Sequence, residues 1–292
     1  MSRKVEKMMP ELKPEDARPE ATKDRFFVRF TRAQRAMHAV LFTTFLGLAA
    51  TGLTMRFSES FWARKFALAV GGFGAILAFH KLCAVVLTIA FLIHMKVVFQ
   101  RGVVQREKGI FWGATSMVMN WKDVKDFFAN MRYFVGLGPR PKFERYSYWE
   151  KFDYWAVFWG MVVIGFSGYA MWFAPFFARF LPGWALNAVL DIHSDEGLLA
   201  ILFIFSIHFV NTHLRPDCFP MDMVIFTGVE SEEEFKHKHP AEYARLAAAG
   251  KLEERLGTKA PVWLVNFSRV AGFTAIFIGL TLLVLTLTAY FR

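Results

Sequence analysis

Long apolar stretches separated by charged segments dominate the pattern of this chain. The twenty residues between Arg35 and Arg56 carry one strongly polar side chain, His38. A helix that crosses the hydrocarbon core of a bilayer needs about 20 predominantly apolar residues. The pattern therefore predicts a first membrane-spanning helix over residues 36–55.

Four further stretches are long and apolar enough to span a membrane. They cover approximately residues 73–98, 154–176, 192–214 and 270–291. We therefore expect an all-α, polytopic membrane protein, in which a four-helix bundle is followed by a fifth transmembrane helix.

The polar segments suggest how the chain is divided. We expect a flexible cytoplasmic tail over residues 1–30, a four-helix transmembrane core over 31–215, a cytoplasmic loop and helix over 216–262, and the fifth transmembrane helix over 263–292. Within the core, residues 100–150 alternate aromatic and basic side chains, which predicts an amphipathic helix in the membrane interface. His237 and His239 lie outside the apolar stretches, so we expect them to be solvated.

The composition excludes an ordinary soluble enzyme. Hydrophobic residues make up 55% of the chain and charged residues only 21%, compared with about a quarter charged in typical soluble domains. The two cysteines cannot form a disulfide framework, and no Cys-x-x-Cys-His motif is present for covalent haem attachment.

The net charge of +10 has a membrane explanation. Of the 35 Lys and Arg residues, 29 fall in the N-terminal 35 residues and in segments 96–151 and 215–269, on one side of the predicted membrane. Because positive residues concentrate on the cytoplasmic side, we expect a cytoplasmic N-terminus and a periplasmic C-terminus. The basic balance then gives no reason to expect a nucleic-acid partner.

Five of the eight histidines lie within or at the rim of the predicted spans. They are His38, His80, His94, His193 and His208. Ionisable side chains are expensive in a membrane and commonly mark function there. His80 and His94 share one helix and His193 and His208 another, and each pair is separated by about 21–22 Å along its axis.

Two histidine pairs across the bundle follow, because both helices run from the outer to the inner side. His80 and His193 lie near the outer side, and His94 and His208 near the inner. Paired neutral imidazoles are axial ligands for low-spin haem iron. His38 lies at the inner depth as well, whereas His213 is about 140° round an α-helix from His208 and is expected to point elsewhere.

An alternative function is a haem-free transporter that uses the intramembrane histidines as a proton relay. Inverted repeats or broken helices would support it, but no such repeat is evident. A non-haem metal site is disfavoured because no carboxylate or thiolate cluster accompanies the inner pair.

Several segments resemble a known family. They are RAMHAVLFTTFLGLAATG from Arg35, the His80 region, ERYSYWEKFDYW before the third span, LDIHSDEG around His193, and HKHPAEY after the fourth span. Over roughly residues 28–245 the chain resembles the membrane cytochrome b subunit of respiratory formate dehydrogenase. Related subunits occur in Ni-hydrogenase, thiosulfate reductase and multihaem cytochrome complexes.

This resemblance implies two haem b groups, held by His80 with His193 on the outer side and by His208 with His38 on the inner side. The chain departs from the formate dehydrogenase pattern by its fifth span, by His94 and by the 15-residue spacing between His193 and His208. Spacing alone favours His94 with His208, and the resemblance favours His38 with His208, so both inner pairs remain open.

The resemblance also implies a menaquinone or ubiquinone site near the inner haem. The corresponding stretch contains Tyr146, Ser147, Glu150, Lys151 and Asp153. The implied protein is an electron-transfer subunit in the bacterial cytoplasmic membrane, where it serves anaerobic respiration. Its expected partner outside the membrane is a multihaem cytochrome c or an iron–sulfur subunit, and other subunits carry the substrate chemistry.

Polar residues near the outer pair suggest supporting roles. Arg56, Arg64 and Lys81 could neutralise haem propionates, although Arg64 could equally be an anchor at the membrane interface. Asp191, Asp195 and Glu196 could accept a hydrogen bond from the other ring nitrogen of His193 or dock a partner.

Overall fold

Five long helical rods form the body of the protein. A computed structural model describes residues 25–291, and within this range five rods are long and apolar enough to cross a membrane. They are Arg32–Arg56, Phe73–Val104, Tyr148–Trp172, Gly183–Leu214 and Val262–Tyr290. The prediction of an all-α polytopic membrane protein is confirmed.

Several rods contain π-helical turns. The segments are α1 (Arg32–Arg56); α3 (Phe73–Phe99) with η1 (Gln100–Val104); α5 (Tyr148–Gly160) with η2 (Met161–Gly165) and α6 (Phe166–Trp172); α8 (Gly183–Phe203) with η3 (Ile204–His208) and η4 (Val210–Leu214); and α12 (Val262–Tyr290). The segments η1 to η4 are π-helical. A π-turn bonds residue i to i+5, so it rotates the side chains that follow it relative to an α-helix.

Local sequence signals start the rods. The hydroxyl of Thr31 accepts a hydrogen bond from the backbone N–H of Gln34 at 3.2 Å, and the Gln34 side chain accepts one from the Thr31 backbone at 2.9 Å. This capping box begins α1. The fourth rod begins at Gly183, directly after Pro182, and therefore starts well before residue 192. The helix therefore continues through Asn187 and Asp191, which precede the predicted span.

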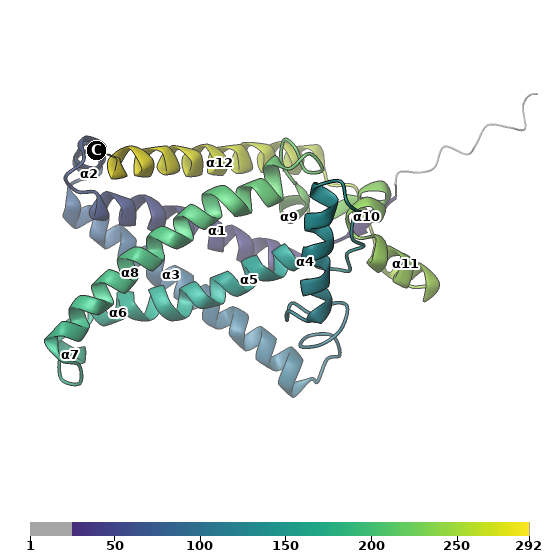
Figure 1. The fold of residues 1–292 in the computed structure, drawn as a ribbon, viewed down its shortest axis with the longest axis horizontal. Helices are drawn as coiled ribbons and strands as arrows, with labels where there is room; N and C mark the ends of the chain where they lie inside the picture. The colour runs from purple at the N-terminus through teal and green to yellow at the C-terminus, as the bar shows by residue number, and fades with distance from the viewer. Residues whose placement is uncertain (1–24, 292) are drawn as a thin grey trace, which may run out of the picture.

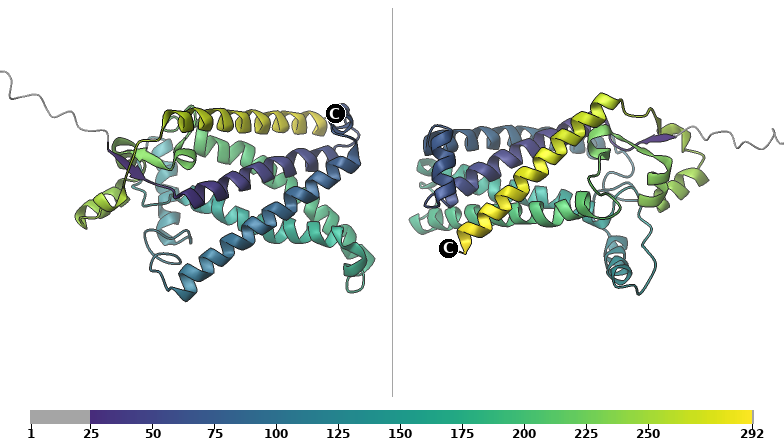
Figure 2. Two further views of the ribbon diagram at one scale, coloured as in Figure 1. Left: turned by 180° about the vertical axis from the view of Figure 1, so that it is seen from behind. Right: turned by 90° about the horizontal axis from the view of Figure 1, so that it is seen from above.

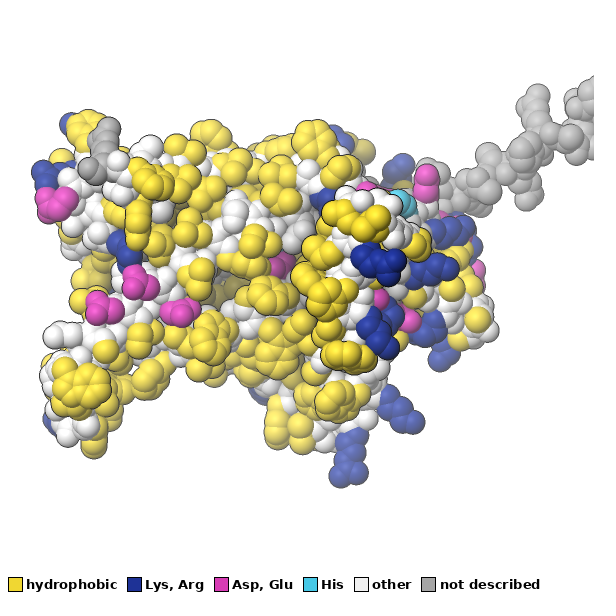
Figure 3. Space-filling view, viewed as in Figure 1, with side chains coloured by type: hydrophobic (Ala, Val, Ile, Leu, Met, Phe, Trp, Pro, Cys, Tyr) yellow, Lys and Arg dark blue, Asp and Glu magenta, His cyan; other side chains and the backbone are white. Residues whose placement is uncertain are grey.

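The shorter elements gather at the two ends of the bundle (Figure 1). One end holds α4 (Trp121–Phe134), α9 (Val224–Thr227), α10 (Glu232–Lys238), α11 (Pro240–Ala248) and η5 (Glu253–Arg255); the other holds α2 (Phe61–Ala69), α7 (Ala174–Phe177) and the end of α12. Figure 3 shows Lys and Arg side chains gathered at the α4 and α10 end and hydrophobic side chains over the body. This arrangement fits rods that are surrounded by lipid.

A small antiparallel sheet lies at the α10 end. Its order is β2 (Val229–Ser231), β1 (Phe26–Val28), β3 (Leu256–Gly257). Phe27 is 1% exposed and packs with Phe235 and Leu246. The structure therefore corrects the expected end of the tail, because residues 26–28 form the central strand. Residues 1–24 of that tail lie outside the described residues.

The structure also corrects the expected environment of His239. Its side chain is buried, and its Nδ1 donates a hydrogen bond to the backbone oxygen of Glu144 at 2.9 Å. Burial, together with the positive charge of Arg29, lowers the pKa of His239 well below its usual value. The expectation of a solvated His239 was wrong, because Pro240 begins a new helix there and turns the chain inward. His237 is exposed, as expected.

The fifth rod is integrated into the bundle. A buried cluster joins α1, the fourth rod and α12, through Ala49, Leu53, Ile201, Phe205, Phe209 and Ile276. A Cβ at Gly279 would lie 2.7 Å from ring atoms of both Phe205 and Phe209. Glycine at this position thus permits the close approach of α12, which crosses α1 obliquely (Figure 2).

Candidate functional site

His80 and His193 face each other across the bundle. His80 lies on α3 and His193 on α8, and their ring centroids are 6.2 Å apart with the planes at 72°. Two metal–nitrogen bonds of about 2 Å, placed end to end between two imidazoles, separate the ring centroids by about 6 Å. The separation therefore fits one metal atom between the two rings.

The hydrogen bonds of His80 define its tautomer. The Thr51 hydroxyl donates to the backbone oxygen of Gly47 at 2.6 Å, and its oxygen lies 2.8 Å from His80 Nδ1. Since the hydroxyl hydrogen is already used, Nδ1 of His80 donates to Thr51. The lone pair of His80 is then on Nε2, where it is available to a metal.

His193 is held in the same tautomer. Its Nδ1 lies 2.9 Å from the backbone oxygen of Ile164, which can only accept, and 3.2 Å from the Ser167 hydroxyl. The Ser167 hydroxyl donates to Val163 at 2.6 Å, so it too accepts from His193. Such hydrogen bonds to the second ring nitrogen are the usual support of a metal-bound histidine.

A glycine gives His193 its space. A Cβ built at Gly168 would lie 2.9 Å from Cε1 of His193, a separation that real Cβ atoms do not adopt. Glycine thus permits α6 to approach the imidazole edge closely enough for the Ser167 and Ile164 contacts.

The acidic residues near His193 do not support it. Asp195 forms an ion pair with Arg56 at 2.8 Å, and Glu196 accepts a hydrogen bond from Trp159 Nε1 at 3.2 Å. The expectation that one of these carboxylates accepts from His193 was therefore wrong. The backbone oxygen of Ile164 in η2 takes that role, and such a backbone contact leaves no signal in the sequence.

An apolar cavity adjoins the outer pair. Its volume is about 640 Å³, within the usual range for cofactor pockets. It is lined by Thr88, Phe91, Met161, Val162, Val163, Gly165, Phe166, Ser167, Tyr169, Val189 and Ile192. Ser167, which contacts Nδ1 of His193, places this cavity beside the outer pair, and its apolar lining is of the kind that surrounds haem.

The inner histidine His208 is supported by a carboxylate. Its Nδ1 lies 2.8 Å from Oδ2 of Asp153, and an ionised carboxylate can only accept. Nε2 of His208 is therefore the nitrogen left for a metal. The sequence had placed Asp153 in the quinone stretch, and its contact with His208 was not foreseen.

His38 and His94 lie on different sides of the inner region. His38 packs against Phe42 and Phe226 and is close enough to His208 for their charges to interact. His94 instead places Nε2 2.9 Å from the Tyr154 hydroxyl and packs against that ring. Of the two candidates, His38 is therefore the one with an interaction toward His208.

His213 also belongs to the inner cluster. Its ring centroid is 6.3 Å from that of His208, although an α-helix would separate the two side chains by about 140°. The π-turns η3 and η4 bring residues i and i+5 nearly into line, so the expectation that His213 points elsewhere was wrong. Its Nδ1 is buried and has no hydrogen-bond partner among residues 25–291.

The residues of the expected quinone stretch have local partners. The hydroxyl of Ser147 and the side chain of Glu150 form the capping box of α5, and the buried Lys151 pairs with Asp123 at 2.9 Å. The guanidinium groups of Arg29 and Arg145 lie 5.4 and 5.5 Å from the Tyr146 ring centroid. The apolar cavity near His193 is lined by other residues.

Comparison with known proteins identifies a family. The model of the prokaryotic cytochrome b561 family matches residues 29–214, well over half of the chain, and this range contains every histidine of the outer and inner clusters. A comparison with curated proteins finds no match. Haem b is the cofactor of this family, and the resemblance expected from the sequence is confirmed. The chain therefore belongs to the prokaryotic cytochrome b561 family and is a multi-pass, haem-binding membrane protein of electron transport.

Proposed function

We propose that the protein is a dihaem cytochrome b that carries electrons across a bacterial cytoplasmic membrane, between the quinone pool and a redox partner outside. It serves as one subunit of a respiratory oxidoreductase complex, as in anaerobic respiration, and other subunits perform the substrate chemistry. The observation that carries this proposal is the His80–His193 pair, with centroids 6.2 Å apart and both Nδ1 atoms engaged.

Some residues of the site bind haem, and others orient the haem ligands. His80 and His193 hold one haem b and His38 and His208 the other, and each haem, when bound, supplies a one-electron redox centre. Thr51 and the backbone of Ile164 fix the outer imidazoles. Asp153 fixes the orientation of the His208 ring.

A menaquinone or ubiquinone is proposed to react beside the inner haem, at residues 146–153. Support comes from Asp153, which contacts His208, and from Glu150, which lies one helical turn earlier on α5. The reaction of a quinone exchanges protons, so ionisable groups are needed within reach.

The orientation follows from the charge distribution. The end with the sheet, α4 and α10 is assigned to the cytoplasm, because segments 96–151 and 215–269, which gather there, carry 19 of the 35 Lys and Arg residues. The opposite end, with α2 and α7, then faces a multihaem cytochrome c or an iron–sulfur subunit.

The test is the haem content of purified protein, measured as the pyridine haemochrome with a reduced-minus-oxidised spectrum. We expect two haem b per chain. His80→Ala or His193→Ala should each remove one haem, and His38→Ala should remove the other. His94→Ala should retain both, as should the control His237→Ala, whose side chain is 57% exposed.

Two results would contradict the proposal. Absence of haem under conditions that load a control cytochrome would favour the proton-relay transporter. Loss of the second haem in His94→Ala, with full retention in His38→Ala, would assign the inner ligand to His94.

A further inference from the structure

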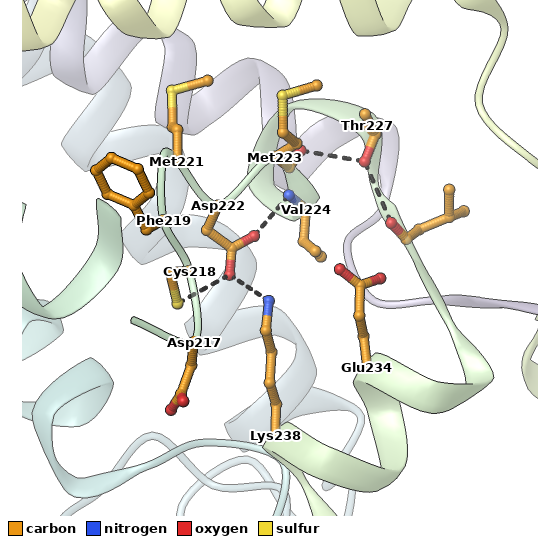
Figure 4. Close-up of a pocket in the computed structure, with 11 residues that line it drawn as sticks. Asp217, Cys218, Phe219, Met221, Asp222, Met223, Val224, Thr227, Glu234 and Lys238 are labelled. Atoms are coloured by element: carbon orange, nitrogen blue, oxygen red, sulfur yellow. Dashed lines mark hydrogen bonds and ion pairs between the residues drawn. The ribbon is translucent and has the colours of Figure 1, made fainter. Parts of the chain in front are cut away.

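A polar cavity lies beyond the inner end of the fourth rod. Its volume is about 200 Å³, room for several water molecules at about 30 Å³ each. Figure 4 shows Lys238 and Cys218 pointing toward Asp222 inside it. Nζ of Lys238 donates to Oδ2 of Asp222 at 2.8 Å, and the backbone N–H of Val224 donates to Oδ1 at 2.8 Å.

A buried carboxyl group lies close to this cavity. Glu230 on β2 is only 3% exposed and is directly opposite Phe27 of β1. Because directly opposite residues point to the same face of a sheet, Glu230 faces the side that α10 and α11 cover. The charged groups whose charges act on it are Arg29 from β1, Asp222 from the cavity loop, Lys238 from α10 and Glu242 from α11.

Charged side chains continue from Glu230 toward the inner histidines. Nη1 of Arg29 donates to Glu242 at 2.9 Å, and Nη2 of Arg29 lies 3.7 Å from Oε1 of Glu150. Glu150 lies one turn of α5 before Asp153, which binds His208. Arg29 thus joins Glu242 to the stretch assigned to the quinone, and the charge of Arg29 also acts on Glu230.

Glu230 differs from Glu242 in its partners. Glu242 forms ion pairs with Arg29 at 2.9 Å and with Arg145 at 3.3 Å, whereas Glu230 has no ion pair within 4.0 Å in the described part of the chain. Burial raises the pKa of Glu230 to about 7, against the opposing effects of Arg29 and Lys238. A carboxyl group with this pKa exchanges its proton near neutral pH.

We propose that Glu230 and the water of the Asp222–Lys238 cavity form the route by which protons pass between the cytoplasm and the inner redox site. This inference rests on the proposed quinone reaction. Reduction of a quinone to a quinol takes up two protons and two electrons, which the inner haem would pass on one at a time, and oxidation of the quinol returns both. Residues 217–238 lie outside the range that the family model matches.

The test uses the haem-loaded full chain, reduced beforehand and mixed with menadione while haem oxidation is followed by stopped flow. In the wild type the rate should fall as the pH rises through about 7, because protonated Glu230 is the donor. Glu230→Gln should be at least about tenfold slower at pH 6 and lose this inflection. Glu230→Asp, which retains a carboxyl group, should keep the inflection.

Glu233→Gln is the matched control, because Glu233 is an exposed carboxylate on α10. It should behave as the wild type, and all variants should retain the haem content and the reduction by dithionite. A second measurement is the redox-induced infrared difference spectrum, in which a protonated-carboxyl band should disappear in Glu230→Gln alone.

The outcomes separate the two proposals. A wild type whose haems menadione does not oxidise would overturn the quinone reaction and this route with it. Wild-type oxidation that Glu230→Gln leaves unchanged in rate and pH profile would overturn the route alone. If Glu230→Gln does not load haem, two other measurements test the route: the pH inflection of Glu230→Asp and the protonated-carboxyl band in the infrared spectrum of the wild type. Absence of that band from the wild-type spectrum would overturn the route.

Discussion

At the scale of single residues, the hydrogen-bond partners of the histidines indicate their role better than their positions in the sequence do. An intramembrane histidine can be a core residue, a proton carrier or a ligand. The two outer imidazoles both donate from Nδ1, to Thr51 and to Ile164, and so both leave Nε2 free. This shared tautomer distinguishes a ligand pair from a proton relay, in which both nitrogens of a ring must exchange protons.

Gly168→Ala should disturb the outer pair. The added Cβ would lie 2.9 Å from Cε1 of His193, and overpacking of this kind destabilises by about 1–3 kcal/mol. We expect reduced occupancy of one haem and a changed spectrum, measured by the haemochrome assay. Gly160→Ala is the control, since its Cβ would lie 3.8 Å from Ile164 Cδ1, an ordinary contact; equal effects of both substitutions would contradict the prediction.

Glu230→Gln should stabilise the protein at neutral pH. The pKa of Glu230 is about 7 in the folded protein against 4.5 for an ordinary glutamate. Between these values unfolding releases a proton, so the free energy of unfolding of the wild type falls as the pH rises from about 4.5 to 7. A glutamine at this position does not titrate, so it causes no such decrease in the free energy of unfolding.

The gain of Glu230→Gln over the wild type should therefore be near zero below pH 4.5 and reach about 1–3 kcal/mol above pH 7. Thermal melts in detergent at several pH values measure it. A difference that does not change with pH would show that Glu230 has an ordinary pKa in the folded protein.

At the scale of elements, the π-turns and the fifth helix decide which side chains meet. The turns η3 and η4 bring His213 to within 6.3 Å of His208, ring to ring. Phe205 and Phe209 of the same rod pack against α12 at Gly279, and the ring centroid of Phe209 lies 6.0 Å from that of His213. Phe209 therefore contacts both the inner histidine cluster and the fifth helix.

Gly279→Leu should loosen α12 from the bundle. The new side chain would overlap the rings of Phe205 and Phe209, whose nearest atoms are 2.7 Å from the Cβ position. We expect a loss of about 1–3 kcal/mol of stability and a lower melting temperature. Thr274→Val, at an exposed position of the same helix, should change the melting temperature little. A larger decrease in Thr274→Val than in Gly279→Leu would mean that α12 presents a different face to the bundle.

At the scale of the whole molecule, the two ends differ in chemistry. One end combines a three-stranded sheet, buried ion pairs and helix α4, and the other consists of α2, α7 and short turns. The two ends of the bundle can therefore be told apart by experiment.

Cysteine labelling tests the orientation. Glu59→Cys lies at the α2 end and Glu253→Cys at the sheet end, and the native carboxylates are 88% and 70% exposed, each in a surface ion pair with an arginine. A membrane-impermeant maleimide should label Glu59→Cys in intact spheroplasts, and Glu253→Cys only after permeabilisation. The native Cys83 and Cys218 are buried and should give little background. The opposite pattern would invert the assigned topology.

The sequence by itself determined the number and approximate positions of the spans, the fold class, the family and the facing positions of His80 and His193. These properties depend on hydropathy and on spacing along regular helices, which are local. It also predicted the exposed His237 and the apolar fifth helix, for the same reason.

Only the tertiary structure decided the contacts between distant segments. The pairing of residues 26–28 with 229–231, the burial of His239, and the hydrogen bonds from His193 to Ile164 and from His208 to Asp153 all join residues far apart in the chain. The relation of His213 to His208 depended on π-turns that a regular helical wheel does not contain. Local pattern sets which face of a helix is apolar, but the packing of helices sets which side chain lies opposite it.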